Sequence, residues 1–260
     1  MNYRTMLLAT AAVLFGTQAM AADLTNPFFT PNKGQITSDT NVGYYRFKAK
    51  HDMGVEEGYY AAETLEYGIT DKFSINGTIA NMFDTQGDYN NDHNFAYNIG
   101  VKYNTNCDKV LLQVAANYST FEPQSFYGSE ASNKWYKHLS GEIKLGYDMG
   151  NGLTPYASYL VSGNIDDADR DLDQSVKIGA HKYFGKYALD LGLRYNFSTD
   201  DGNNGMYEGN YNDLWVEAAA DYYVKENIAV GLYGGYRIDG TQDKNIDYAY
   251  TAGAHLKVLF

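Results

Sequence analysis

The chain has 260 residues and a formal net charge of −12 at pH 7, because 32 aspartate and glutamate residues outnumber 20 lysine and arginine residues. This acidic balance argues against nucleic acid as a partner. A single cysteine excludes an internal disulfide and cysteine-rich metal clusters, and we expect no metal and no cofactor.

Residues 1–21 have the organisation of a signal peptide. Arg4 precedes an apolar run over 6–15, and Ala19-Met20-Ala21 supplies the small-x-small pattern of a cleavage site. The apolar run is much shorter than the roughly 20 residues that a membrane-spanning helix needs. We therefore predict export and cleavage after Ala21.

The next segment, residues 22–35, reads "ADLTNPFFTPNKGQ". Pro27 and Pro31 keep it out of a strand ladder, because proline has no N–H to donate. Two arrangements fit this composition, a periplasmic tether or a short plug folded into the lumen of a barrel, and we favour the tether.

Residues 36–260 alternate apolar and polar side chains with the period of two that is typical of β-strands. In "YALDLGLRYNFS" the residues from Tyr187 to Phe197 at odd positions are aromatic or leucine, and those between them are small, polar or charged. No helix is needed. Counting such runs predicts an all-β chain of about 12 strands, at 41–50, 59–69, 73–83, 95–104, 110–121, 135–148, 153–163, 174–184, 187–198, 213–223, 228–238 and 247–260.

The connections between these strands alternate in length. Short ones such as "GK" at 185–186 take turns with long polar ones such as "TDDGNNGMYEGNYN" at 199–212. This alternation is typical of a transmembrane up-and-down antiparallel β-barrel in the outer membrane, with short turns facing the periplasm and long loops facing outward. An even strand number places both termini of the barrel on the periplasmic side.

Aromatic residues indicate which face of the strands meets lipid. They gather at both ends of the apolar face, as the two interfaces of a bilayer select. Those near the short turns are Tyr67, Phe73, Tyr103, Tyr147, Phe184, Tyr187 and Tyr222, and those near the loops are Phe47, Tyr59, Phe83, Phe95, Tyr118, Trp135, Tyr195 and Tyr248. The apolar face is thus predicted to point outward.

The last strand ends on an apolar row that includes Tyr250, Leu256, Val258 and Phe260. In this feature the chain resembles Gram-negative outer-membrane β-barrel proteins of the porin or channel-like kind, although no motif fixes a subfamily. The resemblance implies that these four residues form the signal read by the barrel-assembly machinery. It also implies residence in the cell outer membrane, with outer-membrane lipid as a partner.

Inward positions carry charges of both signs in similar number. The predicted pore-lining residues are Arg46, Lys48, Glu66, Lys102, Glu142, Lys144, Lys177, His181, Asp190, Arg194, Glu217, Asp221, Arg237 and His255. Two interpretations stay open at this point. The charges form a network that fills the barrel, or they line a narrow hydrated pore for small solutes.

We predict a passive porin-like channel for small solutes, and not an enzyme. A structural or loop-mediated binding or adhesion barrel is the second hypothesis, in which the acidic loops present a solvated surface rather than Ca²⁺ sites. An outer-membrane hydrolase is the third, and it rests only on His138 and Ser140, two residues apart on one inward face.

Glu63 does not fit the pattern. It falls on the apolar face of the second strand, between Ala61 and Leu65. Either a β-bulge turns it inward or the register of that strand differs from the one that the alternation predicts.

Overall fold

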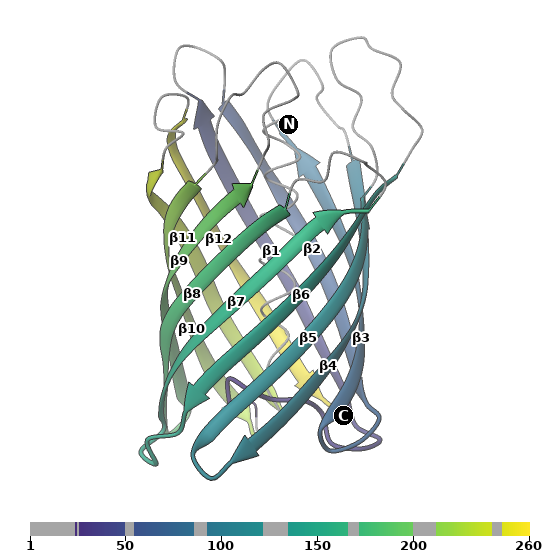
Figure 1. Ribbon diagram of the computed structural model, residues 1–260, viewed down its shortest axis with the longest axis vertical. Helices are drawn as coiled ribbons and strands as arrows, with labels where there is room; N and C mark the ends of the chain where they lie inside the picture. Colours follow the sequence, from purple (N-terminus) through teal and green to yellow (C-terminus); the bar gives the residue numbers. More distant parts are fainter. Residues whose placement is uncertain are drawn as a thin grey trace.

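A computed structural model of the chain describes residues 24, 26–49, 55–85, 93–121, 135–165, 172–199, 212–240 and 246–260. These residues form a closed barrel of twelve antiparallel strands, each paired with its neighbours in sequence and with β1 closing on β12. The strands are tilted relative to the barrel axis (Figure 1), as closure of a sheet requires. The all-β transmembrane architecture predicted from the sequence is confirmed.

All strands have 12 to 15 residues, and nine of them are longer than the alternation alone indicated. The strand at 110–121 and the last strand have the predicted length, and the strand predicted at 135–148 is two residues shorter. The bounds of the strands are β1 (Ile36–Ala49), β2 (Val55–Gly68), β3 (Phe73–Asp84), β4 (His93–Cys107), β5 (Val110–Phe121), β6 (Tyr136–Tyr147), β7 (Leu153–Asn164), β8 (Leu172–Phe184), β9 (Tyr187–Thr199), β10 (Asn212–Lys225), β11 (Ile228–Gly240) and β12 (Ile246–Leu259). No helix in the described part of the chain is long and apolar enough to span a membrane.

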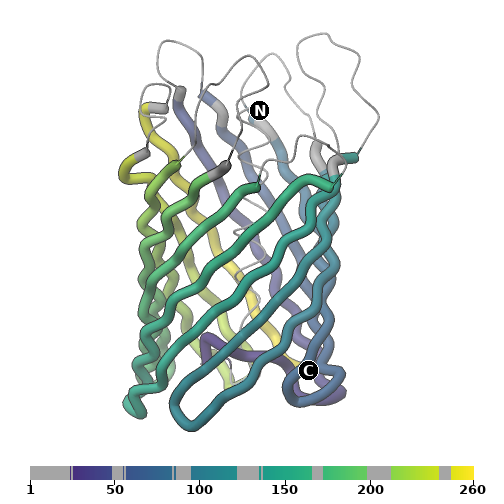
Figure 2. The backbone as a smooth tube through the Cα atoms, viewed as in Figure 1, coloured from purple at the N-terminus to yellow at the C-terminus, as the bar shows by residue number. Residues whose placement is uncertain are grey.

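The short turns lie together at one end of the barrel, where the C-terminus also lies (Figures 1 and 2). The β8–β9 connection is only Gly185-Lys186, and Gly185 has a φ of 67°. A two-residue hairpin needs φ above zero at its centre, which glycine adopts without steric cost. The central parts of the predicted long loops, at 50–54, 86–92, 122–134, 166–171, 200–211 and 241–245, lie outside the described residues.

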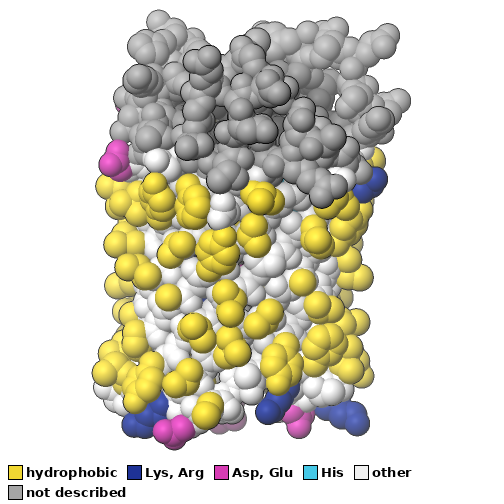
Figure 3. All heavy atoms as spheres, in the orientation of Figure 1, with side chains coloured by type: hydrophobic (Ala, Val, Ile, Leu, Met, Phe, Trp, Pro, Cys, Tyr) yellow, Lys and Arg dark blue, Asp and Glu magenta, His cyan; other side chains and the backbone are white. Residues whose placement is uncertain are grey.

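The two faces of the barrel are reversed relative to a soluble protein. On β9, Leu189, Leu191 and Leu193 are 41%, 59% and 41% exposed, whereas Ala188 and Arg194 are 2% exposed. Figure 3 shows the apolar side chains as a band around the outside, with lysine, arginine and acidic side chains at the turn end. Since only a lipid environment favours an apolar exterior around a polar interior, the barrel is built to span a membrane.

The outer aromatic residues occupy both edges of this band as predicted, with one exception. Phe47, assigned to the outer girdle, is 7% exposed and points into the lumen. The same shift of one position moves Arg46 and Lys48 from the lumen to the outer face, so their assignment as pore-lining residues is wrong.

Strand pairing shows why the faces of β1 were assigned wrongly. Arg46 pairs with Glu57 of β2 and lies on the same face as Val42, which is 51% exposed. In the stretch "YYRFKAK" aromatic side chains occur at odd and even positions, and aromatic and basic side chains both suit a membrane interface, so alternation alone cannot orient it. The buried Asp39 and Asn41, before the predicted start of the strand, fix its lumen face.

Arg46 and Lys48 lie among aromatic rings on the outer face. The Arg46 guanidinium is 3.3 Å from a Glu57 carboxylate oxygen, and the Lys48 ammonium is 3.0 Å from Asp247. Both cations also lie within 6 Å of the Tyr248 ring. These contacts keep the two charges near the outer edge of the apolar band, where polar headgroups meet the protein.

Candidate functional site in the barrel lumen

The remaining predicted pore-lining residues all point into the lumen. They come from eight strands, and ion pairs or burial place each of them there: Glu66, Lys102, Glu142, Lys144, Lys177, His181, Asp190, Arg194, Glu217, Asp221, Arg237 and His255. That they line a conducting pore stays a prediction. Nine of them form three groups at different places on the wall.

The first group lies near the turn end, on β2, β3 and β4. The Lys102 ammonium is 2.6 Å from a carboxylate oxygen of Glu66, and the Ser74 hydroxyl donates to the other oxygen of that carboxylate. The side chains of Lys102 and Glu66 are 4% and 3% exposed. A buried pair of this kind satisfies both charges without water.

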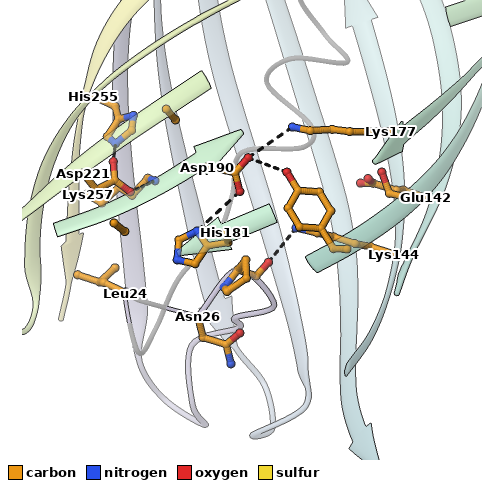
Figure 4. A pocket seen from close by; sticks show the side chains of 15 residues that line it. Leu24, Asn26, Glu142, Lys144, Lys177, His181, Asp190, Asp221, His255 and Lys257 are labelled. Carbon is orange, nitrogen blue, oxygen red and sulfur yellow. Dashed lines mark hydrogen bonds and ion pairs between the residues drawn. The ribbon is translucent and has the colours of Figure 1, made fainter. Parts of the chain in front are cut away.

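The second group spans β7 to β10. Lys177 lies between two acids, 2.9 Å from Glu217 and 3.9 Å from Asp190, and Arg194 contacts the other oxygen of Glu217. Asp190 also accepts a hydrogen bond of 2.6 Å from the Tyr156 hydroxyl. Figure 4 shows Lys177 and His181 converging on Asp190. Successive strands thus share their charges across the sheet.

The third group lies on β10 and β12. Asp221 is 2.5 Å from the His255 ring nitrogen Nε2 and 3.5 Å from the Lys257 ammonium. The Tyr233 ring stacks on His255 with centroids 5.8 Å apart. This group lies beside the Asp190 group on the wall of the same cavity (Figure 4).

The N-terminal segment lies inside the lumen near the turn end, as Figure 2 shows for the purple part of the tube. Side chains on the wall donate to its backbone: Lys144 to the Pro27 carbonyl at 3.0 Å, Lys102 to the Phe29 carbonyl at 3.3 Å, and Asn104 to the Phe28 carbonyl. The described residues of 22–35 therefore adopt the lumen arrangement rather than the tether that we favoured.

Apolar contacts hold the same segment. Leu24, Phe28 and Phe29 are all less than 8% exposed. The Lys144 ammonium lies 4.8 Å from the centroid of the Phe28 ring and 4.3 Å from that of Tyr156, within the range of cation–π attraction. On the wall, Gly146 allows the close approach, because a Cβ there would lie 2.4 Å from the Phe28 ring.

Above this segment the lumen contains a cavity of about 90 Å³ that opens to the rest of the lumen. Its lining combines the second and third charged groups with Leu24, Asn26 and Pro27 of the segment. Acids and bases alternate on its walls, so the cavity suits water and small polar solutes and offers no extended apolar surface.

The pair behind the hydrolase hypothesis lies elsewhere on the lumen wall. His138 on β6 meets the Phe121 ring edge-on at 5.4 Å, and Ser140 pairs across the sheet with Ser162. Neither residue lines the cavity. The described residues contain no group of three or more histidine, cysteine or acidic side chains placed to hold a metal ion.

The comparison with known proteins finds similarity in fold alone. No protein-family model and no curated protein matches the sequence. Among solved structures, an outer membrane channel from Pseudomonas putida F1 superposes with a TM-score of 0.68 at 10% identity, over 90% of this chain and 98% of that chain.

Two further structures extend the range of similar barrels. The NanC porin gives a TM-score of 0.56 at 11% identity, over 84% of this chain and 98% of that one. The translocator domain of the autotransporter NalP from Neisseria meningitidis gives 0.54 at 12% identity, over 99% and 95%. Together with the apolar belt and the polar lumen, these similarities make the chain an outer-membrane β-barrel protein, with outer-membrane lipid around its strands.

Proposed function

We propose that the barrel is a passive channel for small hydrophilic solutes, narrowed at the periplasmic end by its N-terminal segment. The observation that carries the proposal is the partly open cavity above that segment, which is lined by ionisable side chains.

Charge in the cavity favours solutes without a large net charge. Lys177 lies between Asp190 and Glu217, and Lys257 lies against Asp221, so positive and negative potentials largely cancel along the wall. Fixed charges in a low-dielectric wall act strongly on passing ions. Neutral or zwitterionic solutes thus meet the smallest barrier.

The size of the passage is set by the N-terminal segment. Its backbone carbonyls accept hydrogen bonds from the ammonium groups of Lys102 and Lys144. Its Phe28 and Phe29 side chains are buried in the lumen near the turns. We therefore expect only small molecules to pass while the segment is in place. Similarity in fold to a channel and a porin agrees with this proposal.

Solute uptake by liposomes tests the proposal. Protein extracted from outer membranes in its folded form is reconstituted, and swelling is followed in a graded series of neutral sugars. We expect swelling with the smallest sugars, and with larger ones only for a variant that begins at Gly34. Liposomes that swell with neither protein would leave a binding or structural barrel as the better account.

A further inference from the structure

An acidic side chain lies on the lipid-facing surface of β2. Glu63 sits between two outward residues, Ala61 and Leu65, the latter 53% exposed. The pairing of β2 with β1 and with β3 continues without a shift past this position. No bulge therefore turns the carboxylate toward the lumen, and the alternation read from the sequence holds here.

The position of Glu63 is deep in the membrane. Tyr59 and Tyr67, four residues away in each direction, are 55% and 44% exposed and belong to the two aromatic girdles. Four residues of a tilted strand cover about 10 Å of depth. A glutamate side chain is too short to reach either interface over that distance, and hydrocarbon offers it no hydrogen-bond donor.

Polar groups on neighbouring strands surround the carboxylate. On β1, the Ser38 hydroxyl donates to Glu63 Oε1 at 2.6 Å and the Thr40 hydroxyl donates to Oε2 at 2.5 Å. On β3, the Asn81 side chain shares this outer face, and its Oδ1 is covered yet has no hydrogen-bond partner in the described part of the chain. We call Ser38, Thr40, Glu63 and Asn81 the β1–β3 polar patch.

Small side chains lie next to the β1–β3 polar patch, together with the larger Val42 and Ile79. Ala61 lies between Glu63 and Asn81, and β12 presents Ala252 and Ala254 beside β1. By contrast, β8 lies six strands from β2 in either direction around the barrel and presents Ile178, 55% exposed. In a bilayer, small residues let two proteins approach closely, and polar side chains hold them together.

We propose that a second copy of this chain binds to the β1–β3 polar patch, giving a dimer with its two-fold axis along the membrane normal. The Ser38 and Thr40 hydroxyl groups already donate to Glu63 of their own copy, but the carboxylate can accept further hydrogen bonds and the Asn81 amide nitrogen can donate them, so the patch is complementary to itself. Self-complementarity is the requirement of an isologous contact. In the dimer, the Asn81 amide nitrogen of each copy donates to Glu63 of the other.

Cysteine cross-linking in native outer membranes tests the dimer. Cys107 is the only cysteine and is exposed, so Cys107→Ser provides the background. Ala61→Cys places a thiol within the patch, and Ile178→Cys is the matched control on the opposite wall. With a short bis-maleimide we expect about tenfold more cross-linked dimer for Ala61→Cys than for Ile178→Cys.

A second substitution links the contact to the carboxylate. Adding Glu63→Leu to Ala61→Cys should lower the cross-linked fraction about tenfold. Glu63→Gln, which keeps hydrogen bonding, should retain most of it. Both variants should still show the heat-dependent gel migration of a folded barrel, because an outward leucine suits lipid better than an outward acid.

Three results would overturn the proposal. Equal cross-linking at Ala61→Cys and Ile178→Cys would mean that contacts are random collisions. An unchanged dimer after Glu63→Leu would remove the patch from the interface. Mass spectrometry that found Ala61→Cys joined to a different protein would replace the second copy by another partner.

Discussion

The ion pair between Lys102 and Glu66 is predicted to stabilise the barrel from inside. Replacing Lys102 by methionine keeps the length of the side chain but leaves the Glu66 carboxylate, 3% exposed, without its cation. Removing one partner of a buried pair costs about 3–5 kcal/mol. Since the Ser74 hydroxyl still donates to Glu66, we expect about 3 kcal/mol for Lys102→Met.

A double-mutant cycle isolates the pair. Glu66→Gln combined with Lys102→Met removes both charges, and we expect a coupling of about 2 kcal/mol between the two substitutions. The measurement is equilibrium unfolding by urea in lipid vesicles, followed by tryptophan fluorescence. Lys182→Met is the matched control, because Lys182 lies on the outer face near a turn and donates to the exposed Asn151 carbonyl.

The reasoning would be refuted by two results together. If Lys102→Met cost less than about 1 kcal/mol and the coupling were near zero, water in the lumen would satisfy both groups as well as they satisfy each other. The lumen near the turns would then be wetter than the contacts of the N-terminal segment imply.

Three further outcomes follow from the outer face, the terminus and the cavity. Leu191→Arg, at a position 59% exposed on the lipid face, should lower the free energy of unfolding by about 2–4 kcal/mol in urea titrations, whereas Tyr187→Arg at the girdle should cost at most about 1 kcal/mol. Deleting Phe260 should reduce the folded barrel recovered from outer membranes without affecting export, and equal recovery would argue against an assembly signal. Lys177→Gln should shift the reversal potential in a salt gradient toward cation selectivity, because Asp190 and Glu217 lose their shared cation; an unchanged potential would place Lys177 off the conducting path.

Alternation was sufficient for the fold because it is a local property of each strand. On β9, every second residue from Tyr187 to Tyr195 is a large apolar one, and the structure exposes all of them. The parity of Glu63 also indicated the outer face, and the two explanations offered for it, a bulge and a different register, are both wrong. The hydrogen bonds that Ser38 and Thr40 donate to Glu63 could not be predicted from the sequence, since they depend on the register between β1 and β2.

The errors arose where local pattern and long-range pairing differ. Arg46 and Lys48 alternate with Tyr45 and Phe47, and both sets suit an interface with headgroups, so the orientation of β1 is decided by its pairing with β2 and β12. Asp39 could have oriented β1, if the strand had been extended back to Ile36. An acidic side chain at that position is expected to face the polar lumen and not the lipid.

The lumen position of the N-terminal segment could be expected only in part. The phenylalanines at 28 and 29 are more apolar than a tether in water requires. The residues that contact the segment, however, include Gly146 on β6 and the lysines of β4 and β6. All of them lie more than 70 residues further along the chain. Sequence spacing alone carries no information on such contacts.

Single-channel conductance in a planar bilayer tests the central claim most directly. Folded protein taken from outer membranes is compared with a variant that begins at Gly34 and has the same thermal stability. The channel account predicts small, discrete conductance steps for the full protein and larger steps for the variant, because the segment that contacts Lys102 and Lys144 has been removed. Silent bilayers with both proteins would contradict the account and show that the charged lumen is a closed structural network.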